Sequence, residues 1–221
     1  MVKALIFDMD GTMIDSMPSH QKSWTVFCGQ RGLDIDVPEL MRRTTGRTGI
    51  ECMRELFGTL STEQAQAFVD EKEAVYRDLF APVFSEIAGF KAFLGHAQQR
   101  GLAVGVGTAG DRHNQAFAYR HLSLGQTLPT VGGDEGLPGK PEPAIFLEVA
   151  RQLDVAPEHC IVFEDAPLGI EAARRAGMRA VGICSSHTAD ELDGPHVLAR
   201  VPDYHALITY RFLETLHVPT A

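Results

Sequence analysis

Two aspartates follow the first apolar run of the chain, in the segment FDMDGTMIDS at residues 7–16. Asp8 ends the run, and Asp10 stands two residues later, directly before Gly11. Glycine readily adopts the backbone angles of a sharp turn, so both carboxylates can reach one cavity. Such a pair can combine nucleophilic attack by one carboxylate with proton transfer by the other.

Three more polar clusters stand where other apolar runs end. Thr108 closes LAVGVGT, and Lys140 stands in GKPEP just before a predicted helix. Glu164 and Asp165 close IVFED. Because ligands of open α/β sheets bind at the carboxyl ends of the strands, we expect these side chains to meet the two N-terminal aspartates in one cavity.

Carboxylates gathered in one cavity repel one another, by about 4 kcal/mol for a pair about 4 Å apart at an effective dielectric constant of about 20. A hard divalent cation relieves this repulsion, and Mg²⁺ prefers a few carboxylates, backbone oxygens and retained waters. We therefore predict a Mg²⁺ site formed by Asp8, the backbone carbonyl of Asp10 and Asp165. Glu164 is expected to bind the ion directly or through a water molecule.

With the cation in place, these residues can transfer a phosphoryl group. Asp8, the first acid, is predicted to attack phosphorus and form an aspartyl-phosphate. Asp10 is predicted to protonate the leaving alcohol and then to deprotonate the attacking water. Thr108 and Lys140 are predicted to hold the phosphoryl oxygens, and Lys140 also offsets negative charge around Asp8.

The elements that must carry these residues alternate between short apolar runs and amphipathic stretches. From residue 102 onward, the runs LAVGVGT, PTVGG, CIVFED and RAVGIC alternate with helical patterns, and KALIF near the N-terminus is typical of one more central strand. Runs that are apolar on both faces favour a parallel sheet covered by helices on both sides. We therefore predict an α/β fold with a Rossmann-like, doubly wound parallel sheet.

Between the first strand and about residue 80, strand-like runs vanish and helical periodicity replaces them. We predict a helical-bundle cap at residues 16–83, inserted after the first strand of a core domain formed by residues 1–15 and 84–221. The chain would enter the cap directly after residue 15 and leave it near residues 82–86. Paired linkers of this kind are where a hinge is expected.

The clearest helix of the predicted cap begins at a capping box, STEQ at residues 61–64. Three apolar residues share one face of this helix by their spacing: Phe68, Val75 and Leu79. A charged run is expected to form its solvated face: Asp70, Glu71 and Lys72.

Composition limits the partners of the 221-residue chain. A formal net charge of −9 and a pI near 5.4 argue against general affinity for nucleic acid or anionic membranes, which attract basic surfaces. The N-terminus shows no signal-peptide pattern, and no apolar run approaches the length that spans a bilayer. We therefore expect a cytoplasmic monomer acting on a small phosphorylated metabolite, and buried free thiols at its four widely spaced cysteines.

These motifs resemble, in order, the four motifs of the haloacid dehalogenase-like superfamily. They are DMDGT, the strand-end Thr108, KPEPAIF and VFEDAPLGIEAARRAGM, and they are spread over nearly the whole chain. The helical insert resembles the cap of the subgroup that contains β-phosphoglucomutase and the sugar-phosphate phosphatases. The combination is far more specific than a lone pair of aspartates.

Members of the superfamily catalyse several different reactions, so the reaction must be inferred from individual residues of this chain. C2-haloacid dehalogenases lack an acid two residues after the nucleophile, and phosphonatases commonly carry a small residue there. This chain keeps Asp10, which implies phosphoryl transfer. A catalytically silent binding protein of the same fold is the contrasting hypothesis, and the intact Asp8, Lys140 and Asp165 oppose it.

A phosphatase passes the phosphoryl group to water, whereas a mutase must hold a second phosphate. In β-phosphoglucomutase a cap arginine holds that phosphate, and Gly49 stands at the matching position here. Gly110 and Asp111 replace the serine and lysine that follow the second motif of the mutase. These departures favour a Mg²⁺-dependent phosphatase acting on a sugar phosphate. Arg47, beside Gly46 in a predicted loop, is expected to bind substrate and could replace the missing arginine, so a phosphomutase remains the alternative.

His20 and Trp24 match the start of the mutase-like cap. His20 is expected to touch the substrate or to help align Asp10, although a packed or solvent-facing position would explain it as well. Trp24 is expected in the core of the cap. Asp15 and Ser16 are explained by a helix start, because Asp and Ser readily cap helices, and both are left out of the site.

Overall fold

A six-stranded, all-parallel sheet forms the centre of the computed structural model, which describes residues 1–124 and 128–217. Its strand order is β3-β2-β1-β4-β5-β6. The strands are β1 (Ala4–Phe7), β2 (Ala103–Gly107), β3 (Thr130–Val131), β4 (Cys160–Glu164), β5 (Arg179–Ile183) and β6 (Val197–Val201). The order reverses between β1 and β4, which confirms the predicted doubly wound α/β class and puts a ligand-binding crevice beside these strands.

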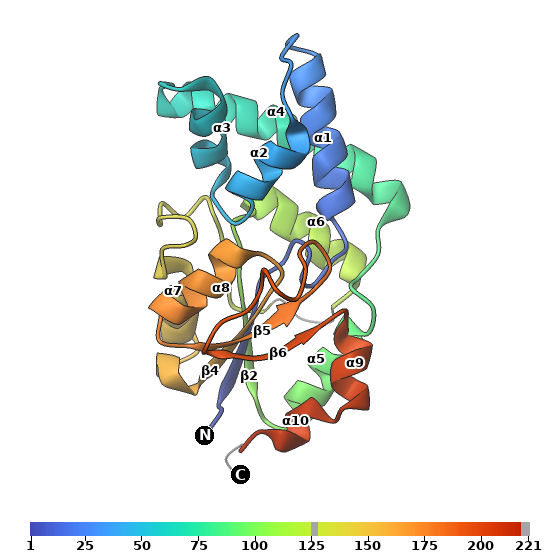
Figure 1. Cartoon of the computed structure of the whole chain (residues 1–221), viewed down its shortest axis with the longest axis vertical. Helices are drawn as coiled ribbons and strands as arrows, with labels where there is room; N and C mark the ends of the chain where they lie inside the picture. Colours follow the sequence, from blue (N-terminus) through green and yellow to red (C-terminus); the bar gives the residue numbers. More distant parts are fainter. Residues whose placement is uncertain (125–127, 218–221) are drawn as a thin grey trace.

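Helices cover both faces of this sheet (Figure 1). One face packs against α5 (Phe90–Gln99), α6 (Arg112–Leu122), α9 (Tyr204–Thr209) and α10 (Phe212–Thr215). The other packs against α7 (Ala144–Gln152) and α8 (Pro167–Arg175). Strand β1 serves both cores, because Leu5 and Phe7 join the first and Ala4 and Ile6 join the second.

Four helices lie beyond the end of the sheet, at the top of Figure 1. They are α1 (Met17–Gly29), α2 (Val37–Thr44), α3 (Gly49–Phe57) and α4 (Thr62–Phe80), followed by the short 3₁₀ helix η1 (Ala81–Val83). They pack around a core of their own that includes Trp24, Phe27 and Val69. The predicted helical cap after the first strand is therefore present, while its boundaries at residues 16 and 83 stay a prediction.

The capping box at the start of α4 is confirmed, but the predicted apolar face of this helix is wrong. Gln64 N–H donates to Ser61 Oγ at 3.2 Å, and Ser61 N–H donates to Gln64 Oε1 at 3.0 Å. The fully buried side chains are Ala65, Val69, Lys72, Tyr76 and Phe80. The three predicted apolar residues are only half-buried. Lys72 belongs to the buried face because its ammonium group has partners there, as described below.

The two linkers between cap and sheet run side by side. Asp15 N–H donates to Ser85 O at 3.0 Å, and Ile87 N–H donates to Met13 O at 3.1 Å. An antiparallel bridge joins Ile14 between them to the same segment. The chain therefore leaves the sheet and returns to it at one place, as a hinge requires.

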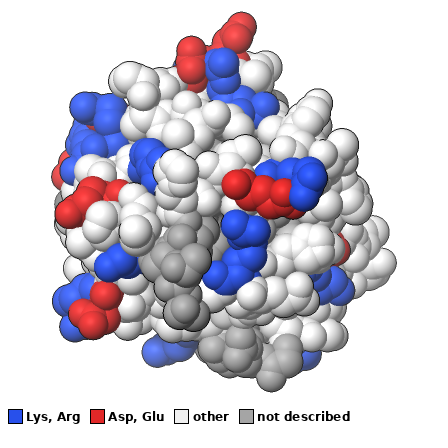
Figure 2. All heavy atoms as spheres, turned by 90° about the horizontal axis from the view of Figure 1, so that it is seen from below, with Lys and Arg blue, Asp and Glu red and all other residues white. Residues whose placement is uncertain are grey.

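The end of the molecule opposite the cap carries the N-terminus and shows basic and acidic side chains interspersed (Figure 2). Within residues 1–124 and 128–217, no helix combines the length and apolar character needed to cross a membrane. All four cysteines are free; Cys28, Cys52 and Cys160 are buried, as predicted, whereas Cys184 is half-buried.

Candidate active site

The ends of β1 and β4 bring three buried acids together. Phe7 pairs in register with Phe163, so Asp8 and Glu164, the next residue of each strand, lie at the same level of the sheet. One carboxylate oxygen from each of Asp8, Glu164 and Asp165 lies within 4.8 Å of the other two. This acidic cluster could hold a metal ion, because hard divalent cations prefer such oxygen donors.

Lys140 lies beside this cluster, in the segment before α7. Its Nζ lies 2.5 Å from Asp8 Oδ1 and 2.7 Å from Glu164 Oε1. Burial opposes the charge of Lys140, but Asp8 and Glu164 raise its pKa above the ordinary value. One ammonium group therefore faces three carboxylates, which leaves negative charge for a divalent cation to neutralise.

Burial also disfavours ionisation of the carboxylates. It raises the pKa of Asp8 to about 8, opposed by the attraction of Lys140 and reinforced by repulsion from Glu164. Burial, with repulsion from Glu164 and Asp8, raises the pKa of Asp165 well above its ordinary value. A group that must be ionised to attack phosphorus or bind a cation thus needs added positive charge in this cavity.

Gly11 makes the close approach of these acids possible. It adopts a positive φ of 76°, and a Cβ atom placed on it would lie 2.2 Å from Asp165 Oδ2. Ser186, on the loop after β5, bonds through its hydroxyl to Asp165 Oδ2. Ser186 was not predicted as a site residue, because a serine in a loop carries no motif.

Asp10 has different surroundings, although it stands only two residues after Asp8. Its Oδ1 accepts hydrogen bonds from Ser16 Oγ at 2.7 Å, His20 Nε2 at 3.1 Å and Tyr76 Oη at 3.2 Å. Burial opposes ionisation, but the hydrogen bonds from His20 and Ser16 and the positive charge of Lys72 hold the pKa of Asp10 below its ordinary value. The Asp10 side chain is therefore engaged by these donors, and a contribution of its backbone carbonyl to a metal site stays a prediction.

Ser16 was expected to be only a helix cap, and this expectation is wrong. It is the N-cap residue of α1, but its side chain makes no capping hydrogen bond to the helix. The hydroxyl donates instead to Asp10. A serine at a helix start can cap the helix or hydrogen-bond to another side chain, so the sequence alone could not decide between these two roles.

Lys72, predicted to face solvent, is buried with only 3% of its side chain exposed. Its Nζ lies 2.8 Å from His20 Nδ1 and 2.8 Å from Glu73 Oε1. Because an ammonium group can only donate, Nδ1 of His20 must accept and Nε2 carries the proton donated to Asp10. A polar chain of His20, Lys72 and Glu73 thus runs through the cap to Asp10.

This polar chain is held at both ends by residues outside the cap helices. Asp10 binds one end, and Asn114 of α6 donates from Nδ2 to Glu73 Oε2 at 2.8 Å at the other. Asn114 also accepts from Arg77 Nη1 at 2.8 Å. Lys72 and Glu73 were not predicted as site residues. The spacing of Lys72 from the apolar residues of the buried face of α4 could have indicated that Lys72 is buried.

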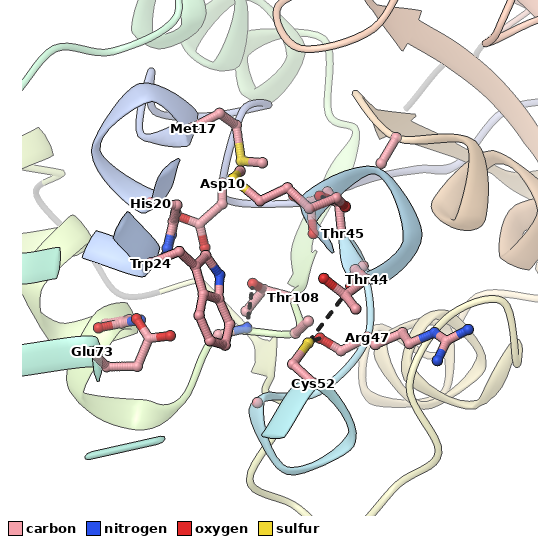
Figure 3. A pocket seen from close by; sticks show the side chains of 18 of the residues that line it. Asp10, Met17, His20, Trp24, Thr44, Thr45, Arg47, Cys52, Glu73 and Thr108 are labelled. Atoms are coloured by element: carbon pink, nitrogen blue, oxygen red, sulfur yellow. Dashed lines mark hydrogen bonds and ion pairs between the residues drawn. The ribbon is translucent and has the colours of Figure 1, made fainter. Parts of the chain in front are cut away.

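A cavity of about 110 Å³ lies between the cap and the strand ends, and its lining includes the acids Asp8, Asp10, Glu164 and Asp165 and the cap residues His20, Lys72 and Glu73. Figure 3 shows Asp10, His20 and Trp24 on one side of the cavity and Thr44 and Cys52 on another. Trp24 belongs to the core of the cap, as expected, and also lines the cavity.

Two more of the predicted site residues line this cavity. Thr108 is buried at the end of β2, where its Oγ1 accepts from Gly110 N–H at 3.0 Å. Arg47 lies on the loop between α2 and α3, but its guanidinium points away from the cavity (Figure 3). That group lies 3.6 Å from Glu55 Oε2. The roles predicted for both residues stay predictions.

Mg²⁺ is expected to raise the melting temperature, and the increment should grow as pH rises from 5 to 8. Folded Asp8 keeps its proton up to about pH 8, whereas an unfolded aspartate loses it near pH 4. Between these values the folded state binds more protons, so its free energy of unfolding falls as pH rises. A bound cation replaces that proton. About 1 kcal/mol shifts the melting temperature by roughly 2–4 °C in a domain of this size, so thermal denaturation with Mg²⁺ or EDTA can resolve the effect.

The matched control for this measurement is Asp165→Asn, which removes one acid of the cluster and should reduce the increment at every pH. An increment that is the same at pH 5 and pH 8 would contradict a cation site at these carboxylates.

Residues 2–177 match the family model described as haloacid dehalogenase-like hydrolase. The parallel sheet and the helical cap inserted after its first strand have the predicted arrangement. The chain belongs to the haloacid dehalogenase-like hydrolase family, which confirms the predicted family and the predicted class of enzyme.

Individual relatives include two phosphatases and one mutase. The chain is 31% identical to validoxylamine A 7′-phosphate phosphatase of Streptomyces hygroscopicus subsp. limoneus, over 90% of this chain and 94% of that protein. It is 33% identical to fructose-1-phosphate phosphatase of Escherichia coli, over 81% and 95%. It is 30% identical to β-phosphoglucomutase of Bacillus subtilis, over 82% and 83%. Among solved structures, a hydrolase from Pseudomonas syringae has the same fold, with a TM-score of 0.86, 23% identity and coverage of 96% and 99%.

Proposed function

We propose that the chain is a Mg²⁺-dependent phosphatase that hydrolyses a small phosphorylated metabolite, a sugar phosphate, through an aspartyl-phosphate on Asp8. One observation carries this proposal: Asp8 and Asp10 line one cavity in two different environments. Asp8 lies in the carboxylate cluster beside Lys140, whereas three donors hold Asp10 under the cap. Two acids in separate environments can serve as nucleophile and proton carrier.

In the first step, Asp8 attacks phosphorus and the sugar alcohol leaves. Lys140 attracts the phosphoryl oxygens as their charge develops. The oxygen of the Thr108 hydroxyl accepts a hydrogen bond from Gly110 N–H. The O–H of the same hydroxyl stays available to donate a hydrogen bond to a phosphoryl oxygen.

Asp8, the backbone carbonyl of Asp10 and Asp165 would hold Mg²⁺, and Glu164 would contact it directly or through water. When bound, the ion neutralises and orients the phosphoryl oxygens. Both oxygens of Glu164 already accept hydrogen bonds, from Lys140 and from Ala166 N–H at 2.6 Å. This arrangement favours contact through water.

Asp10 handles the protons in both steps. A bound phosphate adds negative charge beside Asp10 and raises its pKa, so that it can take up a proton. It then protonates the leaving alcohol and later deprotonates the attacking water. His20 keeps the carboxylate oriented through its hydrogen bond to Oδ1. Arg47 remains a proposed substrate-binding residue of the cap.

A phosphomutase is the second candidate, and the similarity to the Bacillus subtilis enzyme favours it. Against it, Gly49 and Gly110 line the cavity at the positions where the mutase has the arginine that holds the second phosphate and the serine that follows the second motif. We expect β-glucose 1-phosphate with Mg²⁺ to yield at least tenfold more inorganic phosphate than glucose 6-phosphate, measured by coupled assays. EDTA should abolish both products. Dominant isomerisation would contradict the phosphatase, and no turnover of any ester in a broad panel would indicate a binding protein.

We further propose that the enzyme acts as a monomer in the cytoplasm, without nucleic-acid or membrane partners. Its acidic charge supports the part of this proposal that concerns nucleic acid and anionic membranes. Size-exclusion chromatography with light scattering should give a mass near 24.1 kDa.

A further inference from the structure

A second cavity, of about 290 Å³, adjoins the active-site cavity between α4 and the loops after β2 and β3. The two cavities share part of their lining: Gly49, Glu73, Ala109, Gly110 and Asn114. Gly110 lies beside the groups of the proposed chemistry. A Cβ atom placed on it would lie 3.3 Å from Thr108 Oγ1 and 3.5 Å from Asp10 Oδ2. The second cavity therefore begins beside Asp10, the group proposed to protonate the leaving alcohol.

The described residues that line this second cavity include three acids and neither lysine nor arginine. Glu73 comes from the cap, and its charge is offset by Lys72 at 2.8 Å. Asp134 lies 3.9 Å from Arg112, but that side chain is 80% exposed, so solvent screens the pair. The cavity therefore keeps a negative potential on the side of the sheet domain.

Asp111 adds to this negative potential. It is the N-cap residue of α6, and its Oδ1 accepts from Asn114 N–H at 2.8 Å. Burial raises the pKa of Asp111 above its ordinary value, and the nearby charge of Arg77 opposes this shift and favours the carboxylate. The remaining polar groups of the lining, such as Thr62 and Gln66, are neutral.

We propose that the second cavity binds the remote end of the leaving group, and that this end carries hydroxyl or ammonium groups and no second anion. The inference rests on the proposed phosphatase function and narrows its substrate to monophosphate esters of extended polyols or amino-polyols. Carboxylates accept hydrogen bonds from hydroxyl and ammonium donors. A second phosphate in this cavity would be repelled by Asp111 and Asp134.

The charge requirement is tested with two substrates that differ at one position, fructose 1-phosphate and fructose 1,6-bisphosphate. We expect kcat/KM for the bisphosphate to be at least tenfold lower at low ionic strength. The difference should shrink as NaCl is added, because salt screens charge repulsion.

The double variant Asp111→Asn/Asp134→Asn should reduce this discrimination at least threefold. Asparagine caps helices about as well as aspartate, so α6 keeps its N-cap. Asp203→Asn is the matched control, because Asp203 caps α9 by accepting from Ala206 N–H at 3.0 Å and does not line this cavity. If the double variant does not fold, Asp134→Asn alone, on a loop, provides the same comparison.

The space requirement is tested with glucose 6-phosphate and trehalose 6-phosphate, which adds a neutral second ring. We expect the larger ester to have at least the same kcat/KM, and a tenfold lower value would overturn the inference. Equal use of the two fructose esters, or unchanged discrimination in the double variant, would also overturn it and leave the phosphatase intact. Absence of turnover on every ester, including p-nitrophenyl phosphate, would overturn the proposed function and this inference together.

Discussion

Asp8→Asn is expected to reduce turnover by roughly a thousandfold or more, because a neutral amide cannot attack phosphorus or hold the cation in the same way. The fold should survive. Asparagine has nearly the same shape, and the buried cluster disfavours a charged group at this position, because burial and repulsion from Glu164 outweigh the attraction of Lys140 and raise the pKa of Asp8 to about 8. The free energy of unfolding without Mg²⁺ should therefore stay the same or rise. Phosphate release from a sugar phosphate and thermal denaturation measure the two effects separately.

Asp15→Asn is the matched control for this variant. Asp15 lies in the same segment, but its side chain is exposed, and only its backbone N–H makes a described hydrogen bond, to Ser85 O. Its kcat/KM should stay within about twofold of the unsubstituted enzyme. Near-normal activity of Asp8→Asn would remove Asp8 from the nucleophile's role and contradict the whole scheme.

Asp10→Asn is expected to reduce hydrolysis of a sugar phosphate by about 10²–10⁴-fold, the range of general acid-base catalysis. The effect on p-nitrophenyl phosphate should have a different form. Its leaving group is a weak base and departs without a proton, so the first step persists while hydrolysis of the aspartyl-phosphate slows. A rapid release of about one p-nitrophenolate per enzyme, followed by slow turnover, is the expected time course in a stopped-flow measurement.

The control for the proton carrier is Ser16→Ala, which removes one of the three hydrogen bonds to Asp10 Oδ1. A lost hydrogen bond of this kind costs about 1 kcal/mol, so turnover should fall by about tenfold or less. Equal losses on both substrates and no initial burst in Asp10→Asn would show that Asp10 does not carry the proton.

The central part of the candidate site was predictable because it depends on strand ends. Apolar runs located β1 and β4, and parallel pairing then placed Asp8, Glu164 and Asp165 at one edge. Strand β6 was not predicted, because its first four residues alternate between half-buried and exposed positions and do not form an apolar run. An edge strand of this kind looks like a loop in the sequence.

The cap was predicted as helices but not as a source of polar site residues. Lys72 stands in a charged run, which usually marks the solvated side of a helix. Its burial depends on His20 and Trp24, which are distant in sequence, and on the adjacent Glu73. Propensity and periodicity describe one helix at a time, so they cannot report such partners. The direction of the Arg47 side chain escaped prediction for the same reason.

The paired linkers at Asp15 and Ser85 make the cap an exchangeable module. Because the chain departs and returns at neighbouring positions, an insert of any length closes without stretching the sheet, and longer inserts add only a slowly growing entropic cost. The strand pairing that assembles the carboxylates lies entirely outside the insert. Substrate choice can therefore diversify by replacing one contiguous piece of chain, provided that the new piece again supplies a partner for Asp10.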